Sequence, residues 1–200
     1  MQHLLLKFLL MKPKLTILTV LVLFCSSLTA QLLPVKNAWQ TDIAKVISDY
    51  ANGFKNIAGD EVMNNPQSTE FDCRTPVKDA TKCRVIKYSS PTKEIFSWEA
   101  EMLKTDDFEE ATKKFRSLYN SLQHLSVDIN GTKAVFKGEY TKPTEAIKFT
   151  TIVFDTEEKT PELKKLKIAL LLENEMMEWV VKVQVYEKER EDDERGMIKE

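Results

Sequence analysis

The stretch "LKIALLLENEMMEWVVKVQVY", residues 166–186, lies close to the C-terminal end of the chain and predicts two strands. Its first part, "LKIALLL", residues 166–172, predicts one strand. In its second part the apolar side chains recur at every other position, and this period of two indicates another strand. The shared face carries Met177, Trp179, Val181, Val183 and Val185. The polar letters "ENE" between the two parts predict a turn, so we expect an antiparallel hairpin.

Three further stretches show the same strand signature. In "IFSWEAEML", residues 95–103, one face carries Phe96, Trp98, Ala100 and Met102. The stretch "INGTKAVF", residues 129–136, contains the pair Asn130-Gly131, whose left-handed backbone suits a two-residue hairpin turn. The stretch "IKFTTIVF", residues 147–154, predicts another strand.

The first predicted helix follows the residue Ala30. Its apolar side chains recur at steps of three and four, which gives a helix one face that can pack on a core. They are Trp39, Ile43, Val46, Tyr50 and Phe54, with Ile57 extending the row. We expect Gly53 to weaken the last turn and Gly59 to end the helix.

A second helix is predicted from residue 106 onward. Asp106 and Glu109 have the spacing of a capping box, and acidic residues are favourable at the positive end of a helix. The apolar row is wide enough to lie against a sheet. It consists of Phe108, Ala111, Phe115, Leu118, Leu122 and Leu125.

Together these elements predict one α+β domain over residues 31–186. Strands that are joined by short links favour an antiparallel sheet, and we expect about five to seven strands with the two amphipathic helices packed on one face. The stretch "DEVMNNPQSTE" predicts a loop, with a short strand around Phe71. Residues 187–200 are almost all charged and predict a solvated tail.

The N-terminal 30 residues have the three-part pattern of a secretory signal peptide. Lys12 and Lys14 form a basic start, an apolar run follows, and the small residue Ala30 ends it. Met11 is an alternative start site. The apolar run is short for a membrane span, which needs about 20 residues. We therefore expect a periplasmic or secreted protein with no stable membrane insertion after cleavage.

The charge of the predicted mature chain argues against nucleic acid as a partner. Removal of the leader takes away three lysines and no acid, which leaves 26 basic and 31 acidic residues and a net charge of −5. Phosphate contacts from basic residues supply most of the affinity in protein–nucleic acid complexes. A mildly acidic chain without a basic block is poorly suited to that role.

Cys73 and Cys83 are the two cysteines outside the leader. A zinc site needs closely spaced pairs and further Cys or His ligands, and a thioredoxin-like site needs C-x-x-C. Neither pattern is present. In an exported protein a disulfide is the expected state, and closing a loop of about ten residues contributes about 3 kcal/mol in the chain-entropy model. Free or reactive thiols are the alternative.

Catalytic, cofactor and metal motifs do not emerge from the sequence. His124 is the one histidine after the leader, and a place in the last turn of a helix explains it. "SPTK", residues 90–93, has the S-x-x-K spacing but is followed by a strand, so a turn is expected. The chain has only five glycines and no phosphate-binding loop. We predict no catalytic residue, no metal ligand and no cofactor.

Large apolar side chains are expected to form either the core or an apolar pocket. They are Trp39, Tyr50, Phe54, Trp98, Phe115 and Trp179. Three hypotheses follow for the function. The leading one is a non-enzymatic binding or interaction module with an unidentified protein partner. The second is a periplasmic carrier of a small hydrophobic ligand. The third is a hydrolase that uses carboxylates, whose placement depends on tertiary geometry alone.

Overall fold

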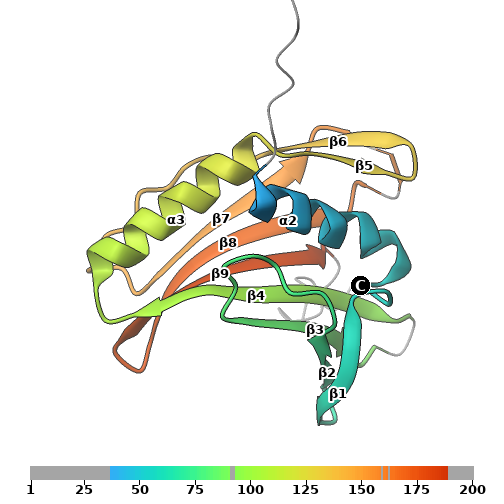
Figure 1. Ribbon diagram of the computed structural model, residues 1–200, viewed down its shortest axis with the longest axis horizontal. Coiled ribbons are helices and arrows are strands. Elements are labelled where there is room, and N and C mark those ends of the chain that lie inside the picture. The colour runs from blue at the N-terminus through green and yellow to red at the C-terminus, as the bar shows by residue number, and fades with distance from the viewer. Residues whose placement is uncertain (1–36, 91–92, 159, 162, 189–200) are drawn as a thin grey trace, which may run out of the picture. The chain divides into compact units, whose positions relative to one another are not determined.

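The computed structural model describes residues 37–90, 93–158, 160–161 and 163–188. The predicted signal peptide, Pro91–Thr92 of the "SPTK" stretch and most of the predicted tail lie outside these residues. The described elements, shown in Figure 1, are α2 (Ala38–Asp49), η1 (Tyr50–Asn52), β1 (Ala58–Asn64), β2 (Ser68–Cys73), β3 (Lys82–Tyr88), β4 (Ile95–Thr105), α3 (Phe108–Gln123), β5 (Ser126–Ile129), β6 (Thr132–Lys137), β7 (Phe149–Thr156), β8 (Leu166–Glu175) and β9 (Glu178–Glu187).

The strands form one sheet in the order β1-β2-β3-β4-β9-β8-β7-β6-β5. Every pair of neighbours is antiparallel. The α+β class and the antiparallel sheet are therefore confirmed. The predicted number of strands is wrong, because the described residues contain nine strands instead of five to seven.

Part of this difference comes from the stretch that was predicted as a loop. β1 pairs with β2, with Glu61 opposite Phe71 and Met63 opposite Glu70. Most side chains of β1 are exposed, so the strand lacks the alternation by which a half-buried strand is recognised. Gly59 lies inside β1 and does not end the first helix. The pairing with β2, and not an amphipathic pattern, makes this segment a strand.

The hairpin of residues 166–187 is confirmed, but its turn lies further along the chain than predicted. β8 continues through the "ENE" letters, and Glu175 pairs with Glu178. The turn is made by Met176 and Met177, whose side chains are 94% and 87% exposed. Met177 therefore does not share the apolar face of Trp179, which is buried.

The core lies between the helices and the face of the sheet that the alternating apolar residues share. β9 is paired on both sides, with β4 and with β8, so its inward side chains are fully enclosed. The inward residues of the central strands belong to one buried cluster, which includes Trp98, Ala100, Ile168, Leu170, Val181, Val183 and Val185. This arrangement explains the nearly continuous apolar letters of β8, because Ala169 and Leu171 on its other face are buried as well.

α3 is the predicted second helix, and its apolar row contacts β4, β6, β8 and β9. Ala111, Phe115, Leu118 and Leu122 are buried. The N-cap is Asp107, one residue later than predicted: its side chain accepts hydrogen bonds from the backbone N–H groups of Glu109 and Glu110. His124 is the C-cap residue, as its place in the sequence indicated.

α2 is shorter than predicted. It begins with a capping box between Asn37 and Gln40 and ends at Asp49. The next residues form a single 3-10 turn, and Gly53 follows with a φ of 64°. Phe54 also has a positive φ, of 57°, which for a residue other than glycine requires support from its surroundings. The fully buried Phe54 side chain supplies that support.

The two helices lie on the same side of the sheet in Figure 1, but they do not share it equally. α3 covers the central strands, whereas α2 contacts β5 at one end of the strand order. The Ser48 hydroxyl donates to the backbone carbonyl of Asp128 in β5, at an Oγ to O distance of 3.1 Å. α2 thus provides a hydrogen-bond donor for a backbone carbonyl group of the edge strand β5, and it also covers core residues. No helix among the described residues is long and apolar enough to cross a membrane.

Candidate functional site

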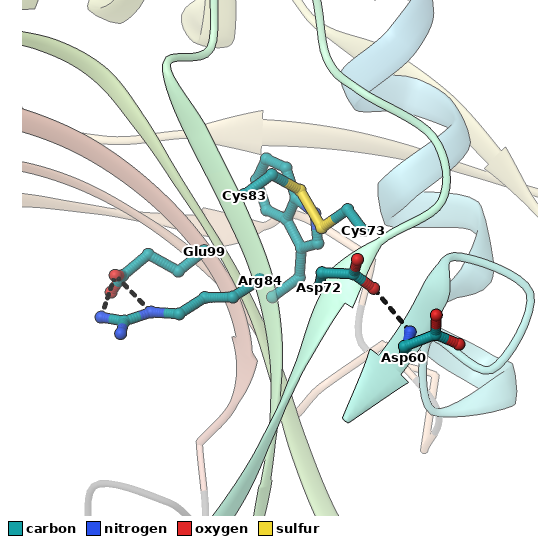
Figure 2. The surroundings of a disulfide bond; sticks show 7 residues. Asp60, Asp72, Cys73, Cys83, Arg84 and Glu99 are labelled. Carbon is teal, nitrogen blue, oxygen red and sulfur yellow. Dashed lines mark hydrogen bonds and ion pairs between the residues drawn. A yellow bond between two sulfur atoms is a disulfide. The ribbon is translucent and has the colours of Figure 1, made fainter. Parts of the chain in front are cut away.

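A disulfide joins Cys73, the last residue of β2, to Cys83 in β3. Figure 2 shows the bond crossing between these two strands. The Trp98 indole N–H donates to the Cys83 sulfur, with 3.1 Å between Nε1 and Sγ. The predicted disulfide is confirmed, and its place beside a buried tryptophan indicates a structural role. A disulfide-bonded domain is compatible with an extracellular location.

A row of polar side chains crosses the face of the sheet that points away from the helices. Arg84 in β3 pairs with Glu99 at 2.6 Å and with Glu70 at 3.0 Å. Gln184 of β9 donates to the other oxygen of Glu99. Burial alone would lower the pKa of Arg84, but the two carboxylates raise it. Figure 2 shows the Arg84 guanidinium directed at Glu99. Each charge in this row has a partner, so the row serves to hold β2, β3, β4 and β9 together.

Two acids share one lysine near the turn of the β8–β9 hairpin. Lys182 pairs with both Glu173 and Glu175. Burial raises the pKa of Glu173, whereas the hydrogen bond from Lys182 lowers the pKa of Glu175. Neighbouring carboxyl groups whose pKa values are pushed apart can act as acid and base. Glu175 and Lys182 border a depression of about 210 Å³, which is small for a substrate site.

A cleft lies where the ends of several elements meet. It has a volume of about 860 Å³ and is open to solvent. Side chains from η1, the start of β4, the β5–β6 turn, the segment before β8 and the end of β9 line it. The polar ones include Tyr50, Asn52, Asn56, Asn130, Lys165 and Glu187. A cleft of this size with convergent polar groups is the usual setting of a small-molecule site.

Asp49 fixes one wall of this cleft. Its buried carboxylate accepts hydrogen bonds from the side-chain nitrogen of Asn52 at 3.0 Å and from that of Asn56 at 2.6 Å. It also accepts from the backbone N–H of Asn56 at 3.0 Å. Each amide nitrogen is engaged by Asp49, and among the described residues neither amide oxygen accepts a hydrogen bond, so both oxygens are available to a ligand. The wall is therefore built before any ligand binds.

Tyr50 and Glu187 are far apart in the sequence, near opposite ends of the domain, but both line the same cleft. Burial raises the pKa of Tyr50, and the negative charge of Glu187 raises it further. The phenol is consequently protonated at every physiological pH. Among the described residues it has no hydrogen-bond partner, so it remains a donor for a ligand.

Two lysines lie beside the Glu187 carboxylate. Lys93 lies 2.7 Å from the Glu187 carboxylate, and Lys165 lies 3.8 Å from it. At the other side of the cleft Lys87 pairs with Glu94 at 2.5 Å and lowers the pKa of that carboxyl group. The cleft is therefore polar without a large excess of either charge.

The six large apolar residues that were singled out in the sequence do not all have the same position. Trp39, Phe54, Trp98, Phe115 and Trp179 are buried in the main core cluster. Tyr50 packs only partly on that cluster and lines the cleft. Phe54 lines the cleft as well. The remaining cleft residues were missed, because they come from segments between residue 50 and residue 187 that only the fold brings together. Gly53 and the Asn130-Gly131 pair are local signals near the cleft, and each marks a turn without indicating a ligand.

Within the described ranges no group of three or more His, Cys, Asp or Glu side chains is arranged to hold a metal ion. Comparison of the chain with protein-family models, with curated proteins and with solved structures gave no match. The inference about function therefore depends on the geometry alone.

Proposed function

We propose that the protein is an exported binding module that holds a polar ligand in the cleft between η1 and the end of β9. The observation that carries the proposal is the wall fixed by Asp49. A buried carboxylate that orients two amide side chains toward a cleft keeps their oxygens in place without a ligand. Such preorganisation lowers the entropic cost of binding.

The chemistry of the cleft favours binding over catalysis. Because its pKa is raised, the Tyr50 phenol stays protonated, so it is a poor nucleophile and a poor general base but can donate a hydrogen bond. The carboxylate of Glu187 is engaged by lysines, so it is poorly placed to accept a proton from a substrate. Donors and acceptors arranged in this way suit recognition of a ligand that carries several polar groups.

Export is supported by the disulfide and by the signal-like leader sequence. Disulfides persist in oxidising compartments and are rare in the cytosol. Expression of the full chain in a Gram-negative host should yield a periplasmic protein that begins at Gln31. Its intact mass should rise by about two hydrogens on reduction, because one disulfide opens. A cytosolic protein that keeps residues 1–30 would contradict export.

The binding test is a titration of the isotope-labelled mature protein, followed by two-dimensional NMR. The probes are methyl β-D-glucoside, N-acetylglucosamine and triglycine at millimolar concentrations. At least one should give saturable shifts confined to the cleft segments around residues 50–56, 94–96, 130, 163–165 and 187. The absence of saturable shifts with all three probes would overturn the proposal.

Two variants locate the binding in the cleft. Tyr50→Phe removes only the hydroxyl, and Asn130→Gly removes a side chain while keeping a residue that tolerates the positive φ of that position. Loss of one hydrogen bond should weaken binding about three- to tenfold in each case. Tyr119→Phe is the matched control, because the Tyr119 hydroxyl donates to the Gly138 carbonyl away from the cleft. Equal effects of Tyr50→Phe and Tyr119→Phe would place the binding elsewhere.

The hydrolase hypothesis finds its best support at Glu173 and Glu175, where burial and Lys182 push the two pKa values apart. The geometry favours it less than the binding module. Lys182 contacts both carboxylates, and a group that must transfer protons to a substrate would have to leave this lysine first.

A further inference from the structure

A second cleft lies next to the polar one, between α2 and β5. Its volume is about 620 Å³. Apolar surface comes from Ala44 and Val46 of α2, from Ile57 just before β1 and from Val127 of β5, and Thr75 also lines the cleft. We use the name α2–β5 cleft for this space.

Asn52 and Asn56 line both clefts. Asp49, which orients these two amides toward the polar cleft, lines the α2–β5 cleft. The two spaces are therefore neighbours on either side of a short segment, and that segment is fixed by hydrogen bonds. A ligand that passes over the two amides would contact a polar space at one end and an apolar space at the other.

The charged groups that border the α2–β5 cleft are already engaged within the protein. Lys45 pairs with Asp42 at 3.2 Å. The Asp128 carboxylate accepts from the backbone N–H of Gly131 at 2.9 Å, and its backbone carbonyl accepts from Ser48. An uncharged, apolar group is therefore the occupant that this cleft suits best.

We infer, on the basis of the proposed function, that one amphiphilic small molecule occupies both clefts. Its head group is neutral and bears hydroxyls, because Glu94 and Glu187, the carboxylates of the polar cleft, are already paired with lysines and because the amide oxygens of Asn52 and Asn56 can accept from hydroxyl donors. Its short alkyl or aryl chain lies in the α2–β5 cleft. Burial of that chain supplies affinity, and the head group supplies orientation.

The test compares three probes by calorimetry and NMR, all below the micelle concentration of the detergent. Methyl β-D-glucoside has the head group alone, octyl β-D-glucoside adds an alkyl chain, and 1-octanol has the chain alone. Octyl β-D-glucoside should bind at least about tenfold more tightly than the methyl glucoside, because several methylene groups leave water. Its NMR shifts should extend from the polar cleft to Ala44 and Val127.

Two variants place a charge in the α2–β5 cleft. Ala44→Glu does so from the helix, and Thr75→Glu does so from an exposed loop where the fold is not at risk. Both should reduce the affinity for octyl β-D-glucoside to that of the methyl glucoside, whose own binding should not change. Ser117→Glu on the exposed side of α3 is the control and should leave both affinities as they are.

The outcomes separate this inference from the proposed function. Equal affinity for the methyl and octyl glucosides would overturn the amphiphile while the polar cleft remains a binding site. Octanol that binds as tightly as octyl β-D-glucoside would also overturn it, since the head group would then contribute nothing. If polar probes, including triglycine, fail to shift the cleft residues, the proposed function fails together with the inference.

Discussion

Two hairpin turns of this protein have the same backbone shape and very different sequences. In the β5–β6 hairpin the turn residues are Asn130 and Gly131, with φ values of 51° and 81°. In the β8–β9 hairpin they are Met176 and Met177, with φ values of 49° and 72°. Asparagine and glycine favour this left-handed conformation, whereas methionine does not.

The two hairpins differ in how many residue pairs join their strands. β5 and β6 are joined by four residue pairs, and the turn is supported by the Asp128 side chain, which accepts from the Gly131 N–H. β8 and β9 are joined by ten residue pairs in the middle of the sheet. A short hairpin depends on its turn residues, but a long central hairpin can impose a strained turn on residues that disfavour it.

The β2–β3 hairpin has a third type of closure, because a disulfide joins the strands in place of a tight turn. Replacing Cys73 and Cys83 by alanine should lower the free energy of unfolding by about 3 kcal/mol, since the loop between them is no longer closed in the unfolded chain. Urea unfolding of the two proteins measures the difference. The exposed lysine variant Lys133→Ala is the control. A loss well below 1 kcal/mol would mean that β2 and β3 need no covalent closure.

Replacing Met176-Met177 by Asn-Gly should raise the free energy of unfolding by about 2 kcal/mol, because two residues are relieved of an unfavourable left-handed conformation. Both side chains are largely exposed, so little packing is lost. Thermal and urea unfolding provide the measurement. The control Met176→Leu with Met177→Leu keeps the strain and should change little. A stabilisation in this control would show that hydrophobicity, and not backbone strain, limits the turn.

A substitution that introduces strain into the β5–β6 turn should destabilise the protein. Gly131→Ala is expected to lower the free energy of unfolding by about 1 kcal/mol, because alanine is strained at a φ of 81°. An added Cβ would meet no atom within 4 Å, so the effect is one of backbone conformation alone. Gly131→Asn should recover most of the loss, because asparagine tolerates this conformation. An unchanged stability of Gly131→Ala would contradict the contrast between the two turns.

Local signals explain which parts of the fold could be predicted. The period of two in β4 and β9, the apolar row of α3 and the Asn130-Gly131 turn each act within a few residues, and each prediction was confirmed. The disulfide was predicted from compartment and spacing. β1 was missed because most of its side chains are exposed and its apolar residues do not alternate with polar ones. The β8–β9 turn was misplaced because long-range pairing overrides the turn preference of "ENE".

The candidate site could not be predicted for a similar reason. Tyr50, Asn130 and Glu187 have no common motif, and only the sheet brings them to one cleft. Asp49 also gave no signal, because a polar residue on a helix is ordinarily exposed, whereas this one is buried and bonded to two amides. A binding site assembled from the ends of several elements leaves no pattern at any single place in the sequence.

The smallest predicted effect concerns the acids that lead into the β8–β9 turn. Burial raises the pKa of Glu173 above its ordinary value of 4.5, so the folded protein holds this proton more tightly than the unfolded chain does. Stability should therefore fall as the pH rises from about 4.5 through the folded pKa, because ionisation is easier in the unfolded state. Glu173→Gln removes this fall, and urea unfolding between pH 4 and 8 measures it.

Glu175→Gln is the matched variant with the opposite sign. The hydrogen bond from Lys182 lowers the pKa of Glu175 in the folded protein. The ionised carboxylate therefore stabilises the fold at pH values above 4.5, the ordinary pKa of the group. This stabilisation is lost as the pH falls through the lowered folded pKa. Glu175→Gln should therefore be less stable than the parent protein at neutral pH and equal to it in acid. Identical pH profiles of the two variants would show that Lys182 does not distinguish between the two carboxylates, and would remove the asymmetry on which an acid–base role for this pair depends.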